Sequence, residues 1–93
     1  MAGNLMGCGG LVRQPRPVYP KEARRQHIEG VVRLAVLVAR DGEPHDIQVM
    51  NGNPVLVPAA LAAVRQWRYA PCKLLGEAVE WKAAIDVSFT LSQ

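Results

Sequence analysis

The sequence lacks a long apolar run and a cysteine framework, and it has only five aromatic residues. Its apolar stretch at residues 31–39 is short and contains Arg33, whereas a membrane-spanning helix needs roughly 20 apolar residues. Cys8 and Cys72 make neither a disulfide framework nor a metal-binding spacing, and their redox state stays open. A chain of 93 residues is enough for one small domain and not for two.

The sequence also lacks the motifs of the common catalytic sites. No nucleophile elbow, phosphate-binding loop or dinucleotide-binding glycine pattern is present. His45 precedes Asp46 on a predicted strand, where neighbouring side chains point to opposite faces. Asp41, Glu43 and Asp46 do not have the spacing of a calcium loop. We therefore expect no enzyme activity, no cofactor and no metal.

Positive charge is concentrated in the first 25 residues. They carry five bases against Glu22 alone, whereas the remainder carries six bases against seven acids. Such an end suits an anionic partner or simply a solvated surface. Nucleic-acid binding would also need stacking aromatics on an exposed face, and Trp81 and Phe89 instead fall on the apolar side of a predicted strand. We therefore expect no nucleic-acid partner.

The stretch Glu77 to Leu91 has period-two patterning almost without exception. From Val79 onward one parity is apolar throughout: Val79, Trp81, Ala83, Ile85, Val87, Phe89 and Leu91. This pattern predicts a single β-strand with one apolar face and one solvated face. At about 3.3 Å per residue the strand would run to about 50 Å, which raises the question of what pairs with its free length.

The remaining chain predicts two more strands and two helices. Residues 31–39 are apolar on both faces, as in a central strand, and a turn at residues 40–42 returns the chain antiparallel over residues 44–50. Pro20 suits the first turn of a short helix that reaches about Gln26. An apolar stripe predicts a second helix, from about residue 55 or 56 to residue 66 or 67.

This order of elements predicts an α+β fold, with a small antiparallel sheet of about three strands and two helices packed on one face. Residues 1–14 are rich in glycine and are expected to form an irregular lead-in or linker remnant. Residues 15–93 then form the domain. Trp67, Tyr69, Trp81 and Phe89 are expected to supply much of its core.

Several short motifs follow one another in a fixed order along most of the chain. They are Pro17-Val18-Tyr19-Pro20, Ile28-Glu29-Gly30-Val31-Val32, Asp41-Gly42, Ala59-Ala60 with Ala63-Val64, Gln66-Trp67-Arg68-Tyr69 with Pro71, Gly76, and Val87-Ser88-Phe89-Thr90-Leu91. Together, over about residues 15–91, they resemble the TonB C-terminal domain family. The resemblance implies the same α+β fold.

The resemblance implies a binding module rather than an enzyme. TonB-type proteins are anchored in the bacterial inner membrane, cross the periplasm and draw on the proton-motive force through inner-membrane proton-channel partners. Their C-terminal domain binds the TonB box, a short segment of outer-membrane transporters, by β-strand addition. This chain would then be a periplasmic domain that couples the proton-motive force to active uptake. Its membrane anchor and its contacts with the proton-channel partners would lie outside this chain.

The resemblance also implies which residues contact the partner. In the family the TonB box pairs beside the last strand, and residues just before the Tyr-Pro motif touch it. The corresponding residues here are Arg16, Pro17, Val18, Tyr19, Ala83, Ala84, Ile85, Asp86, Val87, Ser88 and Phe89. The sequence departs from the family at Arg16, where glutamine is common.

Alternatives remain open for both the module and its residues. The free edge of the last strand would equally accept a second copy of the chain, giving a homodimer. A non-enzymatic structural module of the same fold, which self-associates or binds a cell-envelope component through residues 13–25, is the second hypothesis. Tyr19, Trp67 and Arg68 are each also interpreted as residues that hold the fold together rather than bind a partner.

Overall fold

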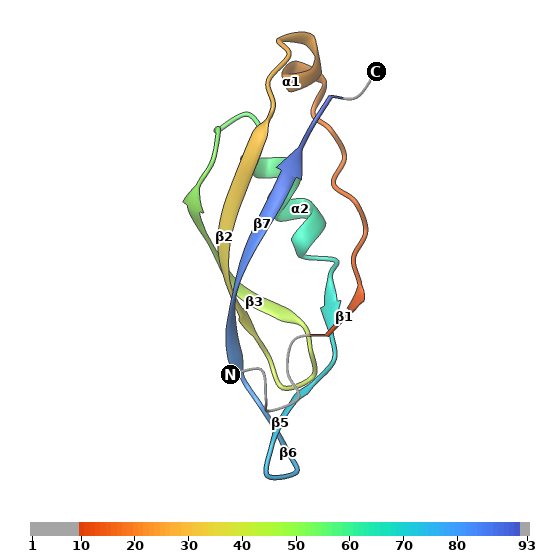
Figure 1. The fold of residues 1–93 in the computed structure, drawn as a ribbon, viewed down its shortest axis with the longest axis vertical. Coiled ribbons are helices and arrows are strands. Elements are labelled where there is room, and N and C mark those ends of the chain that lie inside the picture. Colours follow the sequence, from red (N-terminus) through yellow and green to blue (C-terminus); the bar gives the residue numbers. More distant parts are fainter. Residues whose placement is uncertain (1–9, 92–93) are drawn as a thin grey trace.

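Three strands form the main antiparallel sheet, in the order β3-β2-β7 (Figure 1). The computed structural model describes residues 10–91, in which β2 (Gly30–Val38) lies between β3 (Pro44–Asn51) and β7 (Trp81–Phe89). The position of β2 confirms the prediction made from its two apolar faces. The turn between β2 and β3 is also confirmed, and Gly42 there has a φ of 92°, a backbone conformation that glycine adopts without strain.

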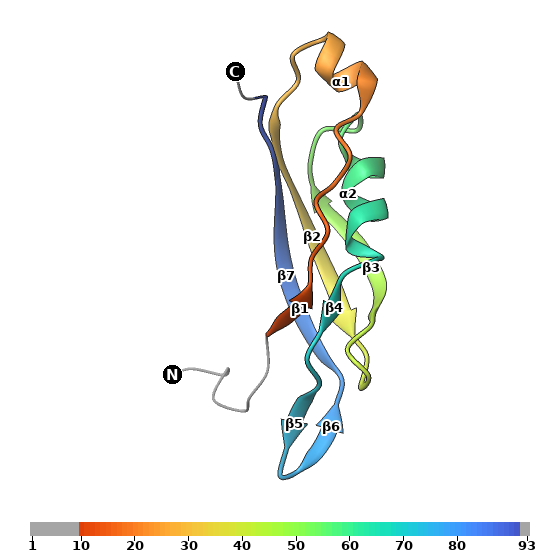
Figure 2. The ribbon, with the colours of Figure 1, turned by 90° about the vertical axis from the view of Figure 1, so that its right-hand side faces the viewer.

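The two helices are α1 (Lys21–Arg25) and α2 (Val57–Val64). Helix α2 packs on one face of the main sheet, and α1 lies at one end of the molecule (Figure 2). Pro58 is in the first turn of α2, where its missing N–H costs nothing. Within the described part of the chain, no helix has the length and apolar composition to cross a membrane. The predicted α+β architecture is confirmed.

The core lies between α2 and the inner face of the sheet. It consists of buried side chains from both helices, from β2 and β7 and from the segments around them: Ala23, Val32, Leu34, Val36, Val38, Leu56, Ala60, Val64, Trp67, Tyr69, Ile85, Val87 and Phe89. Alternate residues of β2 are at most 1% exposed. Because each buried valine or leucine stabilises the fold by about 1.5–3 kcal/mol, this alternation fixes which face of β2 meets the helix.

Two edge-to-face aromatic pairs lie toward opposite ends of the core. Tyr19 meets Phe89 with ring centroids 5.6 Å apart, and Tyr69 meets Trp81 at 5.4 Å. Each such pair contributes about 0.5–1.5 kcal/mol beyond the area it buries. Trp67 is also buried, so the aromatic residues of the second half of the chain do share one core.

The predicted long strand is two strands, and the prediction of one strand of about 50 Å is wrong. Strand β6 (Glu77–Val79) pairs with β5 (Cys72–Leu74) in a separate two-stranded sheet, and β7 begins only at Trp81. Period-two patterning continues through Glu80 because both segments are extended. The pattern reports conformation, and it does not reveal that the pairing partner changes from β5 to β2.

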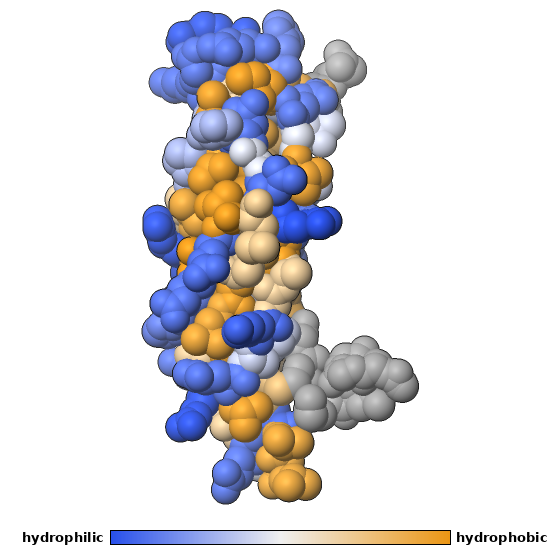
Figure 3. All heavy atoms as spheres, turned by 90° about the vertical axis from the view of Figure 1, so that its left-hand side faces the viewer, coloured by the Kyte–Doolittle hydropathy of each residue, from blue (hydrophilic) through white to orange (hydrophobic). Residues whose placement is uncertain are grey.

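The β5–β6 hairpin projects at the end of the molecule opposite α1 (Figure 1). Its turn, Leu75-Gly76, has φ values of 53° and 85°, as a two-residue hairpin turn with primed geometry requires. Leu75 is 96% exposed and Leu74 46% exposed. They make the tip of the molecule apolar, which is visible at the lower end of Figure 3.

The first described residues also differ from the prediction. Leu11–Arg13 were expected to be irregular, but they form β1, which pairs antiparallel with β4 (Arg68–Tyr69). This pairing joins segments more than 50 residues apart, and no local pattern announces it. Cys8 and the first nine residues of the predicted lead-in lie outside the described residues.

Helix α2 is shorter than predicted at its C-terminal end. After Val64 the chain tightens into three-residue hydrogen bonds, from Gln66 N to Ala63 O and from Trp67 N to Val64 O, both 3.0 Å. Such bonds are common where a helix ends. They turn the chain directly into β4, and they place Trp67 between α2 and β7.

Candidate functional site

Strand β7 forms one edge of the main sheet. It pairs with β2 in continuous register from Gly30↔Phe89 to Val38↔Trp81, with no bulge along its nine residues. On its other side no strand of residues 10–91 is paired with it. A regular edge of this kind presents backbone N–H and C=O groups that an extended chain can pair with.

The opposite edge of the sheet, β3, is built differently. Its pairing with β2 shifts register twice, between Arg33 and Leu34 and again between Ala35 and Leu37. It begins with Pro44, which lacks an N–H, and Asp46 has a φ of 45°. Bulges, proline and charged residues are the features that protect a sheet edge against pairing with another chain. Of the two edges, only β7 is suited to accept a strand.

A groove follows the open edge of β7. Its opposite wall is the extended segment Gln14–Pro17, which follows β1 and runs beside β7 (Figure 1). One cavity of about 380 Å³ is lined by Gln14, Pro15, Arg16, Pro17, Trp67, Asp86, Val87 and Ser88. A second cavity of about 540 Å³ is lined by Leu11, Gln14, Trp67, Tyr69, Trp81, Lys82, Ala83, Ala84, Ile85 and Asp86. The two share Gln14, Trp67 and Asp86, so they form one continuous groove.

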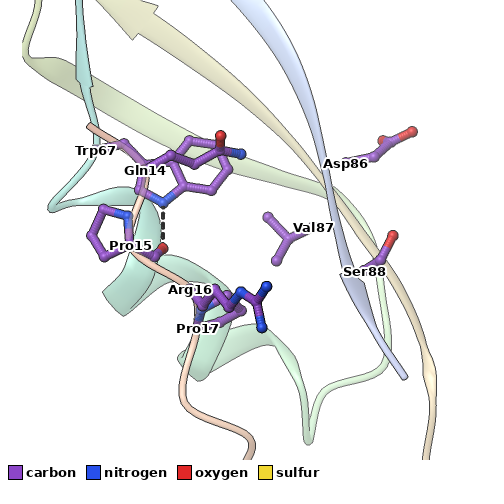
Figure 4. A pocket seen from close by; sticks show the side chains of 8 residues that line it. All are labelled: Gln14, Pro15, Arg16, Pro17, Trp67, Asp86, Val87 and Ser88. Atoms are coloured by element: carbon purple, nitrogen blue, oxygen red, sulfur yellow. Dashed lines mark hydrogen bonds between the residues drawn. The ribbon is translucent and has the colours of Figure 1, made fainter. Parts of the chain in front are cut away.

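The side chains at the first cavity divide between the two faces of β7 (Figure 4). Val87 points into the groove toward Trp67, whereas Asp86 and Ser88 point away on the other face. The Arg16 side chain extends from the opposite wall toward β7. The Trp67 indole Nε1 donates a hydrogen bond of 3.0 Å to the Pro15 carbonyl. This bond fastens the wall of the groove to the end of α2.

Arg33 and Arg16 differ in their electrostatic environment. Arg33 lies directly opposite Asp86 in the register and donates from Nε to Oδ1 (2.9 Å) and from Nη2 to Oδ2 (3.1 Å). The hydrogen bond from Arg33 lowers the pKa of Asp86, and the same bond raises the pKa of Arg33. Arg16 has no ion-pair partner among the described residues. Arg16 and Lys82 are therefore the two cations of the groove lining that have no ion pair in the described structure, and of these Arg16 lies at the first cavity, beside Val87.

Comparison with known proteins identifies the family. The family model for the Gram-negative bacterial TonB protein C-terminal matches residues 15–91. The chain belongs to the TonB C-terminal domain family. It is 35% identical over 85 residues to protein tonB2 of Pseudomonas aeruginosa, covering 89% of this chain and 32% of that protein. It is 32% identical over 80 residues to protein TonB of Vibrio cholerae, covering 84% of this chain and 33% of that protein.

A solved structure of the family has the same fold. The solution NMR structure of the Pseudomonas aeruginosa TonB C-terminal domain superposes with a TM-score of 0.75 at 27% identity, covering 92% of this chain and 96% of that one. The match extends over almost the whole of both domains. The sequence relatives are longer, however, and this chain spans about a third of the length of each.

The groove brings together most of the residues that the TonB resemblance singled out. Arg16 and Pro17 line one wall, and residues 83–88 of β7 line the other. The remaining three do not line these cavities. Val18 is 81% exposed and lines a separate small cavity beside α2, and Phe89 is 3% exposed in the core. Tyr19 packs on Phe89 and donates its hydroxyl to the Ile28 carbonyl, as expected of a residue that holds the segment on the core.

Other groove residues of this TonB-type domain were missed in the sequence. Leu11 and Gln14 were assigned to an irregular lead-in, Pro15 was placed in the domain without a role in the site, and Trp67 was interpreted as a fold-keeping residue. The only signal for Trp67 was general, because a buried indole N–H needs a hydrogen-bond acceptor. That the acceptor would be Pro15, 52 positions away, depends on the tertiary fold.

Proposed function

We propose that this chain is the periplasmic domain of a TonB-type energy transducer, and that it binds the TonB box of outer-membrane transporters by β-strand addition to β7. The observation that carries the proposal is the regular, unpaired edge of β7 facing a groove. Membership of the TonB C-terminal domain family supports it. The domain would pass force derived from the proton-motive force to the transporter and thereby drive active uptake.

The proposed function has further parts besides the binding of the transporter segment. The relatives are about three times as long as the matched segment. We assign the inner-membrane anchor and the contacts with the proton-channel partners to those further regions. The role of the present domain is then limited to gripping the transporter segment. No catalytic step and no cofactor enters that role.

Strand addition accounts for binding that is specific but reversible. Each backbone hydrogen bond between β7 and the incoming segment contributes about 0.5–1.5 kcal/mol net. Ordering a flexible segment on binding offsets part of this gain. The balance gives a weak and transient complex, which suits a coupling that must release its partner after each cycle.

The charge in the groove favours a particular kind of segment. Arg16 extends toward β7 and lacks an ion-pair partner within the described range. Asp86 is already paired with Arg33 on the other face of the sheet. The groove therefore presents a net positive charge near Val87, which suits an acidic side chain on the incoming segment.

A backbone amide NMR titration tests the proposal. The ligands are TonB-box peptides from the outer-membrane transporters of the same genome, and the domain is first shown to be monomeric by sedimentation. We expect shifts at the amides of residues 83–88, at Gln14 and Arg16, and at the Trp67 indole N–H. The amides of β3 serve as the internal control. The absence of chemical-shift changes along β7 at millimolar peptide would overturn strand addition.

Backbone methylation of the peptide sharpens this test. Alternate N–H groups of an added strand point toward β7 and the others point away from it. Methylating one alternate set of peptide nitrogens should abolish binding, while methylating the other set should leave it nearly unchanged. An equal loss of affinity with both sets of methylated nitrogens would indicate a binding mode that depends on side chains or on a helical ligand instead.

The same open edge favours a second candidate, self-association. A second copy of β7 could pair with the first, giving a homodimer of a structural module in the cell envelope. Sedimentation velocity over a range of protein concentrations distinguishes the two. A dimer that persists at micromolar concentration and excludes the peptide would favour this candidate over transporter coupling.

A further inference from the structure

The part of the groove beside Ala83 has a mixed lining, with polar side chains at Gln14, Lys82 and Asp86 and a cluster of apolar side chains on the core side of β7. The side-chain subsite is defined here by Leu11, Trp67, Tyr69, Trp81, Ala83 and Ile85, which line the cavity of about 540 Å³. The rings of Tyr69 and Trp81 meet edge to face at 5.4 Å, so this side of the subsite is held in a fixed geometry. The subsite lies directly against the open edge of β7.

The subsite exists because β7 has a small residue at one inward-facing position. Trp81, Ala83, Ile85, Val87 and Phe89 all face the core side of the strand. Residues two apart on one face of a strand are about 6.6 Å apart, so Trp81 and Ile85 flank the space above Ala83 without filling it. Ala83 is only partly buried, whereas the three inward residues after it are 3–8% exposed.

An added strand would place a side chain in this space. Directly opposite residues of neighbouring strands point to the same face, with Cβ atoms about 4.5–5.5 Å apart. The residue that pairs with Ala83 would therefore project into the subsite. Residues two positions away would meet the larger Trp81 and Ile85 side chains, which leave less room. The groove thus distinguishes positions along the segment by the size of their side chains.

We propose that this subsite binds one large apolar side chain, aromatic or branched aliphatic, of the extended segment paired with β7. This contact fixes the register of the segment and selects among transporter segments. The inference rests on the proposed function, since it requires a strand on β7. It goes beyond backbone pairing, which is tolerant of sequence, by naming a single side-chain position as the main source of specificity.

The test varies side-chain size, first at each position of the peptide and then at Ala83 of the domain. A transporter peptide is prepared as a series in which each position in turn is leucine or alanine, and dissociation constants are measured by calorimetry. We expect one position at which leucine binds about tenfold or more tightly than alanine, the range typical of filling an apolar pocket. In the Ala83→Leu variant this preference should disappear, while the alanine peptide binds within about threefold of its original affinity.

Ala35→Leu is the matched control. Ala35 lies on the neighbouring strand β2, on the face away from the core, and lines neither groove cavity, so this variant adds the same volume outside the groove and should leave the size preference intact. Amide spectra of both variants establish that they are folded. Proton contacts from the peptide leucine to the indole rings of Trp67 and Trp81 provide a readout that needs no variant.

The outcomes separate this inference from the proposed function. Peptides that bind with no size preference at any position, or a preference lost equally in Ala35→Leu, would overturn the subsite and leave strand addition standing. Peptide contacts to Lys82 or Ser88 in place of the indole rings would do the same. If no peptide of the series binds the wild-type domain, the proposed function fails and the subsite with it.

Discussion

Trp67 donates its indole N–H to the carbonyl oxygen of Pro15, 3.0 Å away, and this bond joins the C-terminal end of α2 to the wall of the groove. The ring itself is 3% exposed in the core. Trp67 therefore has two structural roles. Its ring holds α2 on the sheet, and its N–H holds the segment that faces the open edge of β7.

The two roles of Trp67 can be separated by substitution. Trp67→Phe removes the N–H and keeps most of the ring, so we expect a loss of about 1 kcal/mol in the free energy of unfolding. We also expect faster amide exchange at Gln14 and Arg16 and weaker peptide binding. Trp67→Ala removes the ring as well and should cost about 3–5 kcal/mol. Urea unfolding and hydrogen exchange measure both.

An unchanged exchange rate at Gln14 in folded Trp67→Phe would contradict this account. It would mean that β1 pairing with β4 holds the segment without help from the indole. The matched comparison is Tyr69→Phe, which removes a polar group from the same core but none that bonds to residues 14–17 in the described structure.

Gly42 and Gly76 provide a second, paired prediction. Both have positive φ, 92° and 85°, so alanine is strained at either position. A Cβ on Gly42 would lie 1.9 Å from the Tyr69 carbonyl oxygen, whereas a Cβ on Gly76 meets nothing within 4 Å. Gly76→Ala should therefore cost about 1 kcal/mol from backbone strain alone. Gly42→Ala should cost clearly more, because the turn must also move away from β4.

Thermal unfolding of the two variants checks this difference. In a domain of this size about 1 kcal/mol corresponds to about 4–8 °C in Tm. Equal Tm losses for Gly42→Ala and Gly76→Ala would show that the contact between the Gly42 turn and β4 contributes little. The difference also affects the groove, since Tyr69 lines the side-chain subsite.

Much of the fold could be predicted because it follows from local sequence patterns. Alternation placed Val32 and its neighbours on a central strand, and Pro58 placed the start of α2. The change of partner at Glu80 could not be predicted, because an extended chain looks the same beside β5 or β2. The pairing of Leu11 with Tyr69 and the bond from Trp67 to Pro15 could not be predicted either, since each depends on segments far apart in the chain.

The candidate site followed the same division. Family motifs pointed to Arg16, Pro17 and β7, and the structure places them on opposite walls of one groove. The motifs included Tyr19 and Phe89 as well, which instead pack against each other. Motifs mark positions that a family shares, and they do not distinguish a residue that faces the groove from one that supports it.

The pair of Arg33 and Asp86 gives a prediction on pH. The hydrogen bond from Arg33 holds the pKa of Asp86 below its ordinary value of 3.8. A carboxyl whose pKa is lower in the folded state stabilises the fold above its unfolded pKa, and this contribution is lost as the pH falls through the folded pKa. The stabilisation is therefore present at neutral pH and declines only below about pH 4.

Carboxyl-detected NMR titration measures this shift directly. In Arg33→Gln the pKa of Asp86 should rise toward its ordinary value, while peptide binding at neutral pH should change little, because both side chains face away from the groove. The pair is exposed, so its effect on stability is small. A large loss of peptide affinity in Arg33→Gln would instead place this pair in the binding site.

Arg16 gives the prediction that bears most directly on partner choice. Its charge faces the groove without an ion-pair partner among residues 10–91, so an acidic side chain on the segment should gain from it. Arg16→Gln should weaken binding of an acidic peptide by about two- to fivefold, as is typical of an exposed ion pair, and Arg16→Glu should weaken it further. Higher ionic strength should reduce the difference between wild type and Arg16→Gln.

Arg25→Gln is the control for net charge. It removes the same charge from α1, where Arg25 pairs with Glu22 at the far end of the domain. If Arg25→Gln weakened the peptide as much as Arg16→Gln, the attraction would be a property of the whole basic end and not of the groove. A peptide whose acidic residue is replaced by its amide should bind wild type and Arg16→Gln alike, because neither then has a charge pair to lose. That combination of two protein variants and two peptides isolates the one interaction by which Arg16 would help this domain choose its partner.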